Sequence, residues 1–366
     1  MDHPENDAQY AGLAVNKGIE QPPIVNPYLK KMRTAKRRSF TASEYVEGIV
    51  KGDTSILSQA VTLVESNRYE HQTLAQEVIE KCLPHACDSV RVGITGVPGA
   101  GKSTSIDTFG LHVLKRGGKL AVLAIDPSSE RSKGSILGDK TRMEKLSIHP
   151  NAFIRPSPSA GSLGGVARKT RETIVLCEAA GYNNIFVETV GVGQSETAVH
   201  SMVDFFLLIQ LAGTGDELQG IKRGIMEMAD GIVINKADGD NLEPAKLAAS
   251  QFRNALHLFP APESGWIPKV LTYSGFYNIG VKEIWDMVYE YIDFVKKNGY
   301  FDYRRNEQSK YWMYETINEQ LRDSFYHNPR IEAMLQEKEQ QVLQGNLTSF
   351  IAAKSLLDTY FDELKR

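Results

Sequence analysis

The chain has 366 residues, of which 42% are hydrophobic and 24% are charged, and its net charge is −3 from 42 basic and 45 acidic side chains. These values exclude a collagen-like or wholly disordered chain, and the near-zero charge argues against a general nucleic-acid binder. No apolar run reaches the ~18 residues of a membrane span, and the acidic start Met1–Tyr10 lacks the basic, apolar pattern of a targeting signal. With three cysteines, the sequence predicts a cytoplasmic protein without a disulfide scaffold or a membrane partner.

Two different patterns precede the predicted core. Residues 1–40 are polar and contain a basic stretch at 30–38, which is typical of a solvated face and can also serve as a phosphate or partner-docking patch. From Ser43 to Lys81, apolar residues recur three and four positions apart, which predicts two or three helices. We therefore expect a tail at 1–40 and N-terminal helices at 41–87.

Short β-branched runs then alternate with helical stretches over residues 88–300. The predicted strands are Val90–Ile94, Leu120–Ile125, Ile185–Val187, Phe205–Leu211, Gly231–Ile234 and Val270–Tyr273. The predicted helices include Ser103–Lys115, Val166–Ala180 and Val281–Val295. This alternation predicts an α/β fold whose central sheet is mostly parallel and flanked by helices.

The composition changes after Tyr300. Residues 301–366 are rich in Glu, Gln, Lys and Arg, with apolar residues such as Trp312, Ile317 and Leu356 at helical spacing. So short a segment cannot bury these side chains in a core of its own. We therefore expect a C-terminal helical arm that packs on a second copy and forms a homodimer.

A phosphate-binding motif lies between the first predicted strand and helix. Residues 96–103 read GVPGAGKS and fit the pattern G-x-x-x-x-G-K-[ST] of P-loop NTPases. In such a loop, backbone N–H groups and the helix N-terminus face the phosphates, so we expect Lys102 to reach the β- and γ-phosphates and Ser103 to bind Mg²⁺. The predicted nucleotide-binding residues here are Gly96, Val97, Pro98, Gly99, Ala100, Gly101, Lys102, Ser103 and Thr104.

A second motif predicts which base is bound. Asn235-Lys236-Ala237-Asp238 follows the strand Gly231–Ile234, and a carboxylate at Asp238 can accept hydrogen bonds from both N1–H and the exocyclic amine of guanine. Adenine would leave that carboxylate without its donors, so the motif predicts GTP and GDP as ligands rather than ATP. We expect Asn235 to brace the loop and the Lys236 stem to lie over the purine. Ser274 and Gly275 are candidates for a backbone contact to the guanine oxygen.

Three acidic residues have positions suited to a metal site. Asp126 and Glu188 end predicted strands, and Asp139 lies in a glycine-flanked loop. Because Mg²⁺ prefers hard oxygen ligands and keeps several waters, we expect some of these carboxylates to act through water. The predicted metal-shell residues are Ser103, Asp126, Asp139 and Glu188.

The loop after Glu188 predicts how the γ-phosphate is sensed. The N–H of Gly191 is the expected contact to this phosphate, in a loop that can relax after hydrolysis. Small signalling GTPases place a water-orienting Gln directly after the equivalent glycine, whereas this chain has Val192. A valine cannot orient water, so the sequence predicts slow intrinsic hydrolysis that a partner stimulates.

Several longer blocks match a known family. They are AIDPSS at 124–129, GSILGDKTRM at 134–143, RPSPS at 155–159, SLGGVA at 162–167, VETVGVGQSE at 187–196 and GTGDELQGIKRGIMEMAD at 213–230. Together with GVPGAGKS and NKAD, these blocks resemble the MeaB/ArgK family of P-loop GTPases. The resemblance implies a GTP-hydrolysing, dimeric metallochaperone that gates cobalamin loading of a methylmalonyl-CoA mutase-type acyl-CoA mutase and protects that enzyme.

The resemblance also implies roles for individual residues. It places Lys102, Glu188 and Gly191 in the catalytic centre, and it makes residues 213–222 an extra switch loop that relays the nucleotide state to the mutase. The expected working residues of that loop are Asp216, Gln219 and Lys222, with Asp216 and Lys222 also assigned to catalysis.

Two other functions remain open from the sequence. A nickel-insertion GTPase would share this core, but such proteins carry His- or Cys-rich stretches, whereas the eight histidines here are scattered. The nearest approach to a metal cluster is Cys82-x₂-His85-x-Cys87, which we interpret as structural. A lysine/arginine/ornithine transport kinase or ATPase is the other alternative, which N-K-x-D disfavours. The chain has no D-x-H-x-x-G cobalamin motif, so cobalamin would bind mainly to the partner.

Overall fold

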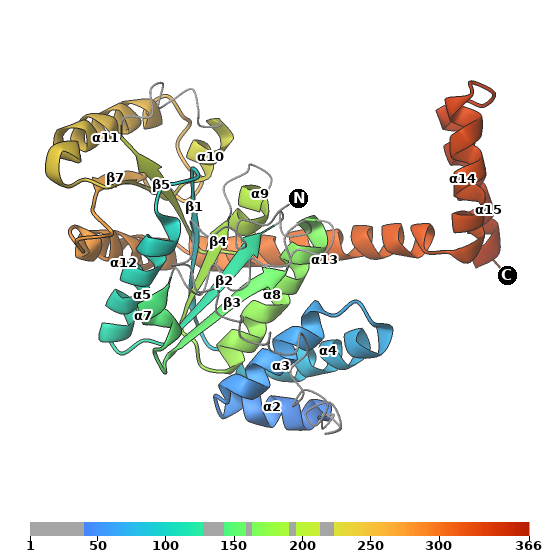
Figure 1. Ribbon diagram of the computed structural model, residues 1–366, viewed down its shortest axis with the longest axis horizontal. Helices are drawn as coiled ribbons and strands as arrows, with labels where there is room; N and C mark the ends of the chain where they lie inside the picture. The colour runs from blue at the N-terminus through green and yellow to red at the C-terminus, as the bar shows by residue number, and fades with distance from the viewer. Residues whose placement is uncertain (1–39, 127–142, 159–162, 190–194, 213–222, 366) are drawn as a thin grey trace, which may run out of the picture. The chain divides into compact units, whose positions relative to one another are not determined.

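A seven-stranded sheet with the order β3-β2-β4-β1-β5-β6-β7 forms the centre of the protein (Figure 1). Every neighbouring pair is parallel, which confirms the predicted α/β class. The computed structural model describes residues 40–126, 143–158, 163–189, 195–212 and 223–365, and Thr41–Arg366 fold as one compact unit. The strands are β1 Val90–Gly96, β2 Leu120–Asp126, β3 Ala152–Pro158, β4 Asn184–Thr189, β5 Phe205–Leu211, β6 Gly231–Asn235 and β7 Lys269–Thr272.

One strand of this sheet was not predicted. β3 is an edge strand that pairs only with β2, with Leu123 opposite Arg155 and Ala124 opposite Pro156. Its sequence contains Pro156 and Pro158, and proline has no N–H to donate to a strand neighbour. An edge strand tolerates proline because the backbone groups on its outer side have no neighbouring strand to bind. From the sequence alone, the two prolines indicate a loop.

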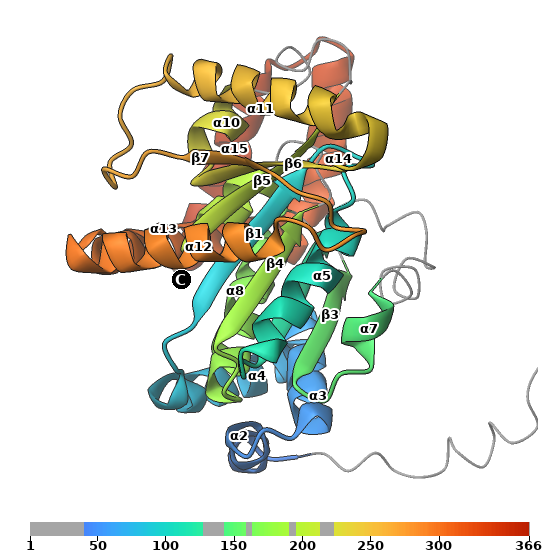
Figure 2. The same cartoon turned by 90° about the vertical axis from the view of Figure 1, so that its left-hand side faces the viewer.

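Helices cover both faces of the sheet (Figure 2). Side chains of α5 and α12, including Phe109 and Trp285, pack with Phe186, Phe205 and other sheet residues into the larger apolar core. On the opposite face, α8, α9 and α11 pack against the strands. The helices of the core are α5 Lys102–Lys115, α7 Glu144–Ser147, α8 Leu163–Ala179, α9 Ser195–His200, α10 Arg223–Met228, η4 Gly239–Asn241, α11 Leu242–Leu256 and α12 Val281–Lys297.

The predicted N-terminal helices number three. They are α2 Ala42–Val50, α3 Thr54–Glu65 and α4 Tyr69–Cys82, followed by the short η3 Leu83–His85. Thr41 and Glu44 form a capping box at the start of α2, and the Asp53 side chain caps α3, so these two helices begin at residues that bind free N–H groups of their first turns. The N-cap of α4, Arg68, makes no such side-chain bond.

The C-terminal helices are α13 Tyr300–Tyr326, α14 Pro329–Leu343 and α15 Ser349–Leu364. The first half of α13 packs on the helices and strands of the α/β core, because Phe301, Gln308 and Trp312 are buried there. The Trp312 indole N–H donates to the carbonyl oxygen of Ser201 at 3.0 Å. Beyond this point, α14 and α15 pack on each other around Ile331, so only the later part of the predicted arm has a small core of its own.

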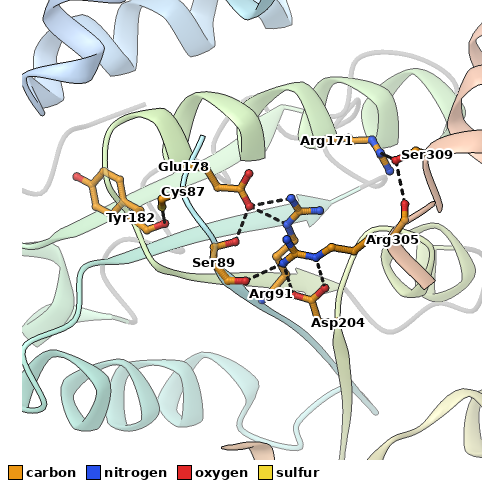
Figure 3. A network of polar contacts seen from close by, with 9 residues as sticks. All are labelled: Cys87, Ser89, Arg91, Arg171, Glu178, Tyr182, Asp204, Arg305 and Ser309. Carbon is orange, nitrogen blue, oxygen red and sulfur yellow. Dashed lines mark hydrogen bonds and ion pairs between the residues drawn. The ribbon is translucent and has the colours of Figure 1, made fainter. Parts of the chain in front are cut away.

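Two adjacent arginines of α13 bind residues that precede three strands. Arg305 donates from Nε and Nη2 to both carboxylate oxygens of Asp204, just before β5, and from Nη2 to the carbonyl oxygen of Ser89, just before β1 (Figure 3). Arg304 donates from Nη1 to Asp230, just before β6, at 3.2 Å. α13 is therefore held by buried charged hydrogen bonds at the amino ends of the central strands. No described helix is both long and apolar enough to cross a membrane.

Candidate functional site

The P-loop begins where β1 ends at Gly96 and finishes where α5 starts at Lys102. Gly101 is the N-cap of α5 in the left-handed conformation, with φ 84°, and a Cβ there would lie 2.7 Å from the Asn235 Nδ2. A Cβ on Gly96 would lie 2.2 Å from the carbonyl oxygen of Ile209 on β5. Only glycine fits either position, so the loop can lie close to β5 at Gly96 and to the end of β6 at Gly101.

Lys102 is held over this loop. Its Nζ donates to the carbonyl oxygens of Gly96 at 2.8 Å and Val97 at 3.3 Å. An ammonium has three donors, so two of them are directed at the loop's own backbone. Burial lowers the pKa of Lys102, while the carboxylates of Glu188 and Glu196 oppose that shift.

Ser103 and Glu188 lie together beside the loop. The Ser103 hydroxyl donates to Glu188 Oε1 at 3.4 Å, and Glu188 lies on β4 between Ile94 of β1 and Ala124 of β2. A hydroxyl and a carboxylate are the hard oxygen ligands that suit Mg²⁺. Across the described ranges, no group of three or more His, Cys, Asp or Glu could hold a metal by itself, so this pair fits a cation that phosphates and waters also coordinate.

The other predicted metal residues lie at or beyond the edge of what the structure describes. Asp126 is the last residue of β2, one position after the pair formed by Ile125 and Thr189, so its backbone reaches the same sheet edge as Glu188. Six other residues from the sequence analysis lie outside the described residues: Asp139, Gly191, Val192, Asp216, Gln219 and Lys222.

Asn235 connects three loops at the carboxyl ends of the strands. Its buried side chain donates from Nδ2 to the carbonyl oxygen of Ala100 in the P-loop at 2.7 Å. Its Oδ1 accepts from the backbone N–H of Lys236 at 2.8 Å and of Gly275 at 3.1 Å. The phosphate loop, the N-K-x-D turn and the loop after β7 are therefore fixed to one another through a single amide.

The N-K-x-D turn lies at the protein surface, where the side chains of Lys236 and Asp238 are accessible to a ligand. Lys236 is exposed and takes a left-handed φ of 60°, which is uncommon for a residue other than glycine. The turn is supported because Asn241 Nδ2 donates to the carbonyl oxygen of Lys236 at 2.7 Å and the Ala237 N–H donates to that of Tyr273 at 3.0 Å. Asp238, partly exposed, is the N-cap residue of η4, and its side chain makes no capping hydrogen bond there.

Comparison with known proteins identifies the chain as a member of a family. The model of the family described as methylmalonyl Co-A mutase-associated GTPase MeaB matches residues 57–330. The chain belongs to the MeaB family. It is accordingly a GTPase that binds guanine nucleotide and hydrolyses GTP, which confirms the resemblance and the predicted enzyme class.

Similar proteins cover most of this chain. A probable GTPase of Mycobacterium tuberculosis is 47% identical over 327 residues, which are 89% of this chain and 97% of that protein. The mouse protein named methylmalonic aciduria type A homolog, mitochondrial, is 45% identical over 335 residues, 89% of this chain and 80% of that one. A crystal structure titled LAO/AO transport system kinase superposes with a TM-score of 0.70 at 35% identity, covering 89% of this chain and 99% of that one.

The structure of this MeaB-family member adds residues that the sequence analysis did not single out. On α5, Thr108 Oγ1 donates to the carbonyl oxygen of Gly275 at 2.9 Å, and Ser105 Oγ lies 2.6 Å from Tyr273 Oη. These bonds tie the loop after β7 to the helix that starts at the P-loop. Serine and threonine three residues apart carry no signal in the sequence, because their role depends on the strand that lies beside them.

Glu196 belongs to the VETVGVGQSE block, but the sequence analysis gave it no role. It is 1% exposed on α9, its Oε2 accepts from Ser195 Oγ at 3.4 Å, and its Oε1 has no hydrogen-bond partner within the described ranges. Val199, one turn later on α9, packs against Gly93 of β1. Glu196 therefore lies nearer the P-loop end of β1, which explains its effect on the pKa of Lys102. The only sequence feature that could have identified Glu196 as a site residue is its position in the VETVGVGQSE block.

The cysteine-histidine segment has structural contacts. Cys82 is fully buried, and burial raises the pKa of its thiol to about 11. Cys87 donates from Sγ to the carbonyl oxygen of Tyr182 at 3.6 Å, and His85 is exposed at the end of η3. The two thiols thus pack or bond within the protein, in agreement with the structural interpretation.

Proposed function

We propose that this GTPase is a chaperone of a cobalamin-dependent acyl-CoA mutase of the methylmalonyl-CoA mutase type, gating its cobalamin loading and protecting it. The description of the family, which names association with methylmalonyl-CoA mutase, supports the partner. The relatives named for methylmalonic aciduria type A, in mouse and in Caenorhabditis elegans, support the same metabolic setting.

The nucleotide site of this proposal is the edge of the sheet organised by Asn235. The P-loop residues 96–104 hold the phosphates, Asp238 reads guanine, and Ser274 and Gly275 offer backbone contacts to the base. The observation that carries this assignment is the hydrogen bonding of Asn235 to Ala100, Lys236 and Gly275, because it joins the phosphate end to the base end of one site.

Lys102 is the residue that we assign to charge stabilisation during hydrolysis. Its ammonium leaves the carbonyl oxygens of Gly96 and Val97 for the β- and γ-phosphates when GTP binds. Ser103 and Glu188 hold Mg²⁺, with Asp126 and Asp139 completing its shell directly or through water. Mg²⁺, when bound, neutralises charge on the phosphates. Hydrolysis without a partner is slow because Val192 cannot orient the attacking water.

The nucleotide state reaches the mutase through two loops in this proposal. The γ-phosphate contacts Gly191 and orders the loop after β4, which biases residues 213–222 between two arrangements. Residues 213–222 connect β5, which ends at Leu211, to α10, which begins at Arg223. The contacts of α13 with Asp204, before β5, and with Asp230, before β6, lie at the opposite, amino ends of these strands.

The homodimer of this proposal uses the C-terminal helices. An apolar groove of ≈ 780 Å³ lies between α13, α14 and α15, and its lining includes Leu321, Leu343 and Phe361, all largely exposed. Deleting residues 329–366 keeps the part of α13 that packs on the sheet and removes most of this groove. We expect dimers of the full chain and monomers of the truncated chain in sedimentation, with GDP affinity retained. A full-length monomer at micromolar concentration would contradict the dimer.

The transport-kinase alternative differs in its nucleotide. Although one structural relative is titled a transport system kinase, an acceptor carboxylate at Asp238 favours guanine over adenine. Titration with GDP and ADP separates the two functions: equal affinities would contradict the guanine-specific site.

The test of the chaperone function is GTP turnover with and without a purified methylmalonyl-CoA mutase. We expect the mutase to raise turnover, and GTP to change the affinity of the mutase reciprocally, since coupling between binding sites works in both directions. Asp216→Ala and Lys222→Ala should retain nucleotide affinity and lose the stimulation, whereas Lys282→Ala, which removes an exposed lysine on α12, is the matched control. Absence of stimulation in the wild type would overturn the proposal.

A further inference from the structure

Two aromatic side chains beside the base-reading residues are open to solvent. Phe276 is 81% exposed and Tyr277 is 62% exposed, and both directly follow Gly275. Their ring centroids are 5.0 Å apart, with the planes nearly perpendicular at 85°. Phe276 is, with Phe350 on α15, one of the two most exposed aromatic residues in the part of the chain that the structure describes, so this pair presents an apolar surface beside the base-reading residues.

The loop that carries these rings is fixed at both ends. Ser274 and Ile279 exchange backbone hydrogen bonds at 3.0 and 3.1 Å, and the Tyr277 N–H donates to Ser274 Oγ at 3.2 Å. The Gly275 N–H donates to Asn235 Oδ1, the amide that also binds the N-K-x-D turn. The backbone of Phe276 therefore has a defined place next to the residues that face the base.

The hydrogen-bonding groups at this site can bind the edge atoms of a purine, but they do not cover both flat faces of its ring. Asp238 and the Gly275 backbone can read edge atoms, and the exposed Lys236 stem can lie against one face. The opposite face of the purine loses water when an apolar group covers it, and an aromatic ring can stack on any base whatever hydrogen-bonding groups that base carries at its edge.

We propose that Phe276 stacks on the guanine base and contributes affinity without contributing guanine specificity. This inference rests on the proposed nucleotide site at Asn235 and Asp238. The roles are thereby divided: Asp238 distinguishes guanine from other bases, and the ring of Phe276 binds any purine that reaches the loop.

Three variants test this division. Phe276→Ala should weaken binding of GDP and of IDP, which lacks the exocyclic amine, by the same factor of about ten, and should leave binding of inorganic tripolyphosphate unchanged. Phe276→Leu keeps an apolar side chain and should recover most of the loss. Phe350→Ala, which removes an equally exposed phenylalanine from α15, is the matched control and should bind every probe as the wild type does.

A second measurement detects the contact directly. The three natural tryptophans are at most 6% exposed, so iodide quenching of Phe276→Trp reports mainly on the new indole. We expect GDP to quench this fluorescence and to protect it from iodide, and tripolyphosphate to do neither.

The outcomes separate this inference from the proposed function. Equal GDP and ADP affinity in the wild type would overturn guanine reading by Asp238, while the ratio of Phe276→Ala to wild type would still decide the stacking. Unchanged GDP and IDP affinity in Phe276→Ala, or an indole that GDP does not protect, would overturn the stacking. Loss of mutase stimulation with unchanged nucleotide affinity would also overturn it, because the ring would then belong to a protein interface.

Discussion

The side-chain amide of Asn235 donates a hydrogen bond of 2.7 Å to the backbone carbonyl oxygen of Ala100, 135 residues earlier in the chain. The bond joins the end of β6 to the P-loop across β5, which lies between β1 and β6 in the sheet. Because the same amide accepts from Lys236 and Gly275, phosphate and base recognition depend on one buried side chain. The relation explains why an asparagine, with both donor and acceptor, stands at this position.

Asn235→Ala should weaken GDP binding more than any substitution of an exposed residue in the turn. The change leaves the Ala100 carbonyl oxygen and the N–H groups of Lys236 and Gly275 without their partner, and each orphaned buried group costs about 1–3 kcal/mol. We expect GDP affinity to fall about 10- to 100-fold in calorimetric titration. Asn241→Ala, which removes a single exposed bond to the turn, is the control, and an equal loss there would contradict this interpretation.

Asp238→Asn should change the preferred base. An amide presents a donor to the xanthine oxygen where the carboxylate accepted from the guanine amine, so we expect XDP to bind better than GDP in the variant. The loss of GDP affinity should reach at least about 100-fold, as in sites built around specific hydrogen bonds. Asp240→Asn, two residues away in the exposed η4, should keep the GDP preference; a variant at Asp238 that still prefers GDP would refute the assignment.

Glu188→Gln should raise the Mg²⁺ concentration needed for GTP hydrolysis by about 10- to 100-fold, because it removes one carboxylate charge from the metal site. GDP binding without Mg²⁺ should change little. Lys102→Ala serves as the contrasting variant: turnover should fall about 100- to 1,000-fold at every Mg²⁺ concentration. If Glu188→Gln needs no more Mg²⁺ than the wild type in a turnover titration, the metal assignment fails.

The sequence predicts six of the seven strands, including β7 at one edge of the sheet, and misses β3 at the other edge. The apolar run Phe205–Leu211 predicts β5 with its observed bounds, because a strand buried on both faces is apolar at almost every position. β3 was not predicted because Pro156 and Pro158 indicate a loop unless the strand is known to be at the edge. Strand order is a long-range property, so no local pattern reveals which strand is last.

In the candidate site, too, residues in local motifs could be predicted, whereas residues placed by long-range packing could not. Motif spacing named Lys102, Ser103 and Asn235 and predicted that Asn235 braces its loop, since these residues lie in fixed local patterns. The contacts of Glu196 near Lys102 could not be predicted, because they depend on how α9 packs on Gly93 of β1. The base site remains a prediction, with Asp238 as its decisive residue.

Arg305→Ala should destabilise the protein strongly. It leaves the carboxylate of Asp204, 2% exposed, without its guanidinium, and breaking a buried pair costs about 3–5 kcal/mol. We expect a matching fall in the free energy of unfolding measured with urea. Lys310→Ala, five residues further on α13, removes an exposed ion pair with Glu307 and should leave that free energy unchanged. Comparable effects in the two variants would show that burial of the Asp204 pair contributes nothing.

Acid should destabilise the fold through His200. Burial, together with the charge of Arg304, lowers the pKa of His200 from 6.5 to about 3. The unfolded chain therefore binds a proton below pH 6.5 that the folded chain does not, so stability falls as the pH decreases from 6.5 toward 3. Between pH 6.5 and 5 this group alone should cost about 2 kcal/mol. His200→Gln should flatten this part of the pH profile of urea unfolding, whereas His257→Gln, at an exposed position, should reproduce the wild-type slope.

The bond between Arg305 and the carbonyl oxygen of Ser89 spans 216 residues and has a consequence for biosynthesis. At about 5–20 residues per second, a ribosome takes about 10–40 s to add the residues between them. During this interval the Ser89 carbonyl oxygen, which Figure 3 shows bound to Arg305 in the folded protein, lacks that partner. The amino end of the P-loop strand can therefore gain its bond to Arg305 only after every strand of the sheet has been synthesised, because β7 ends at Thr272.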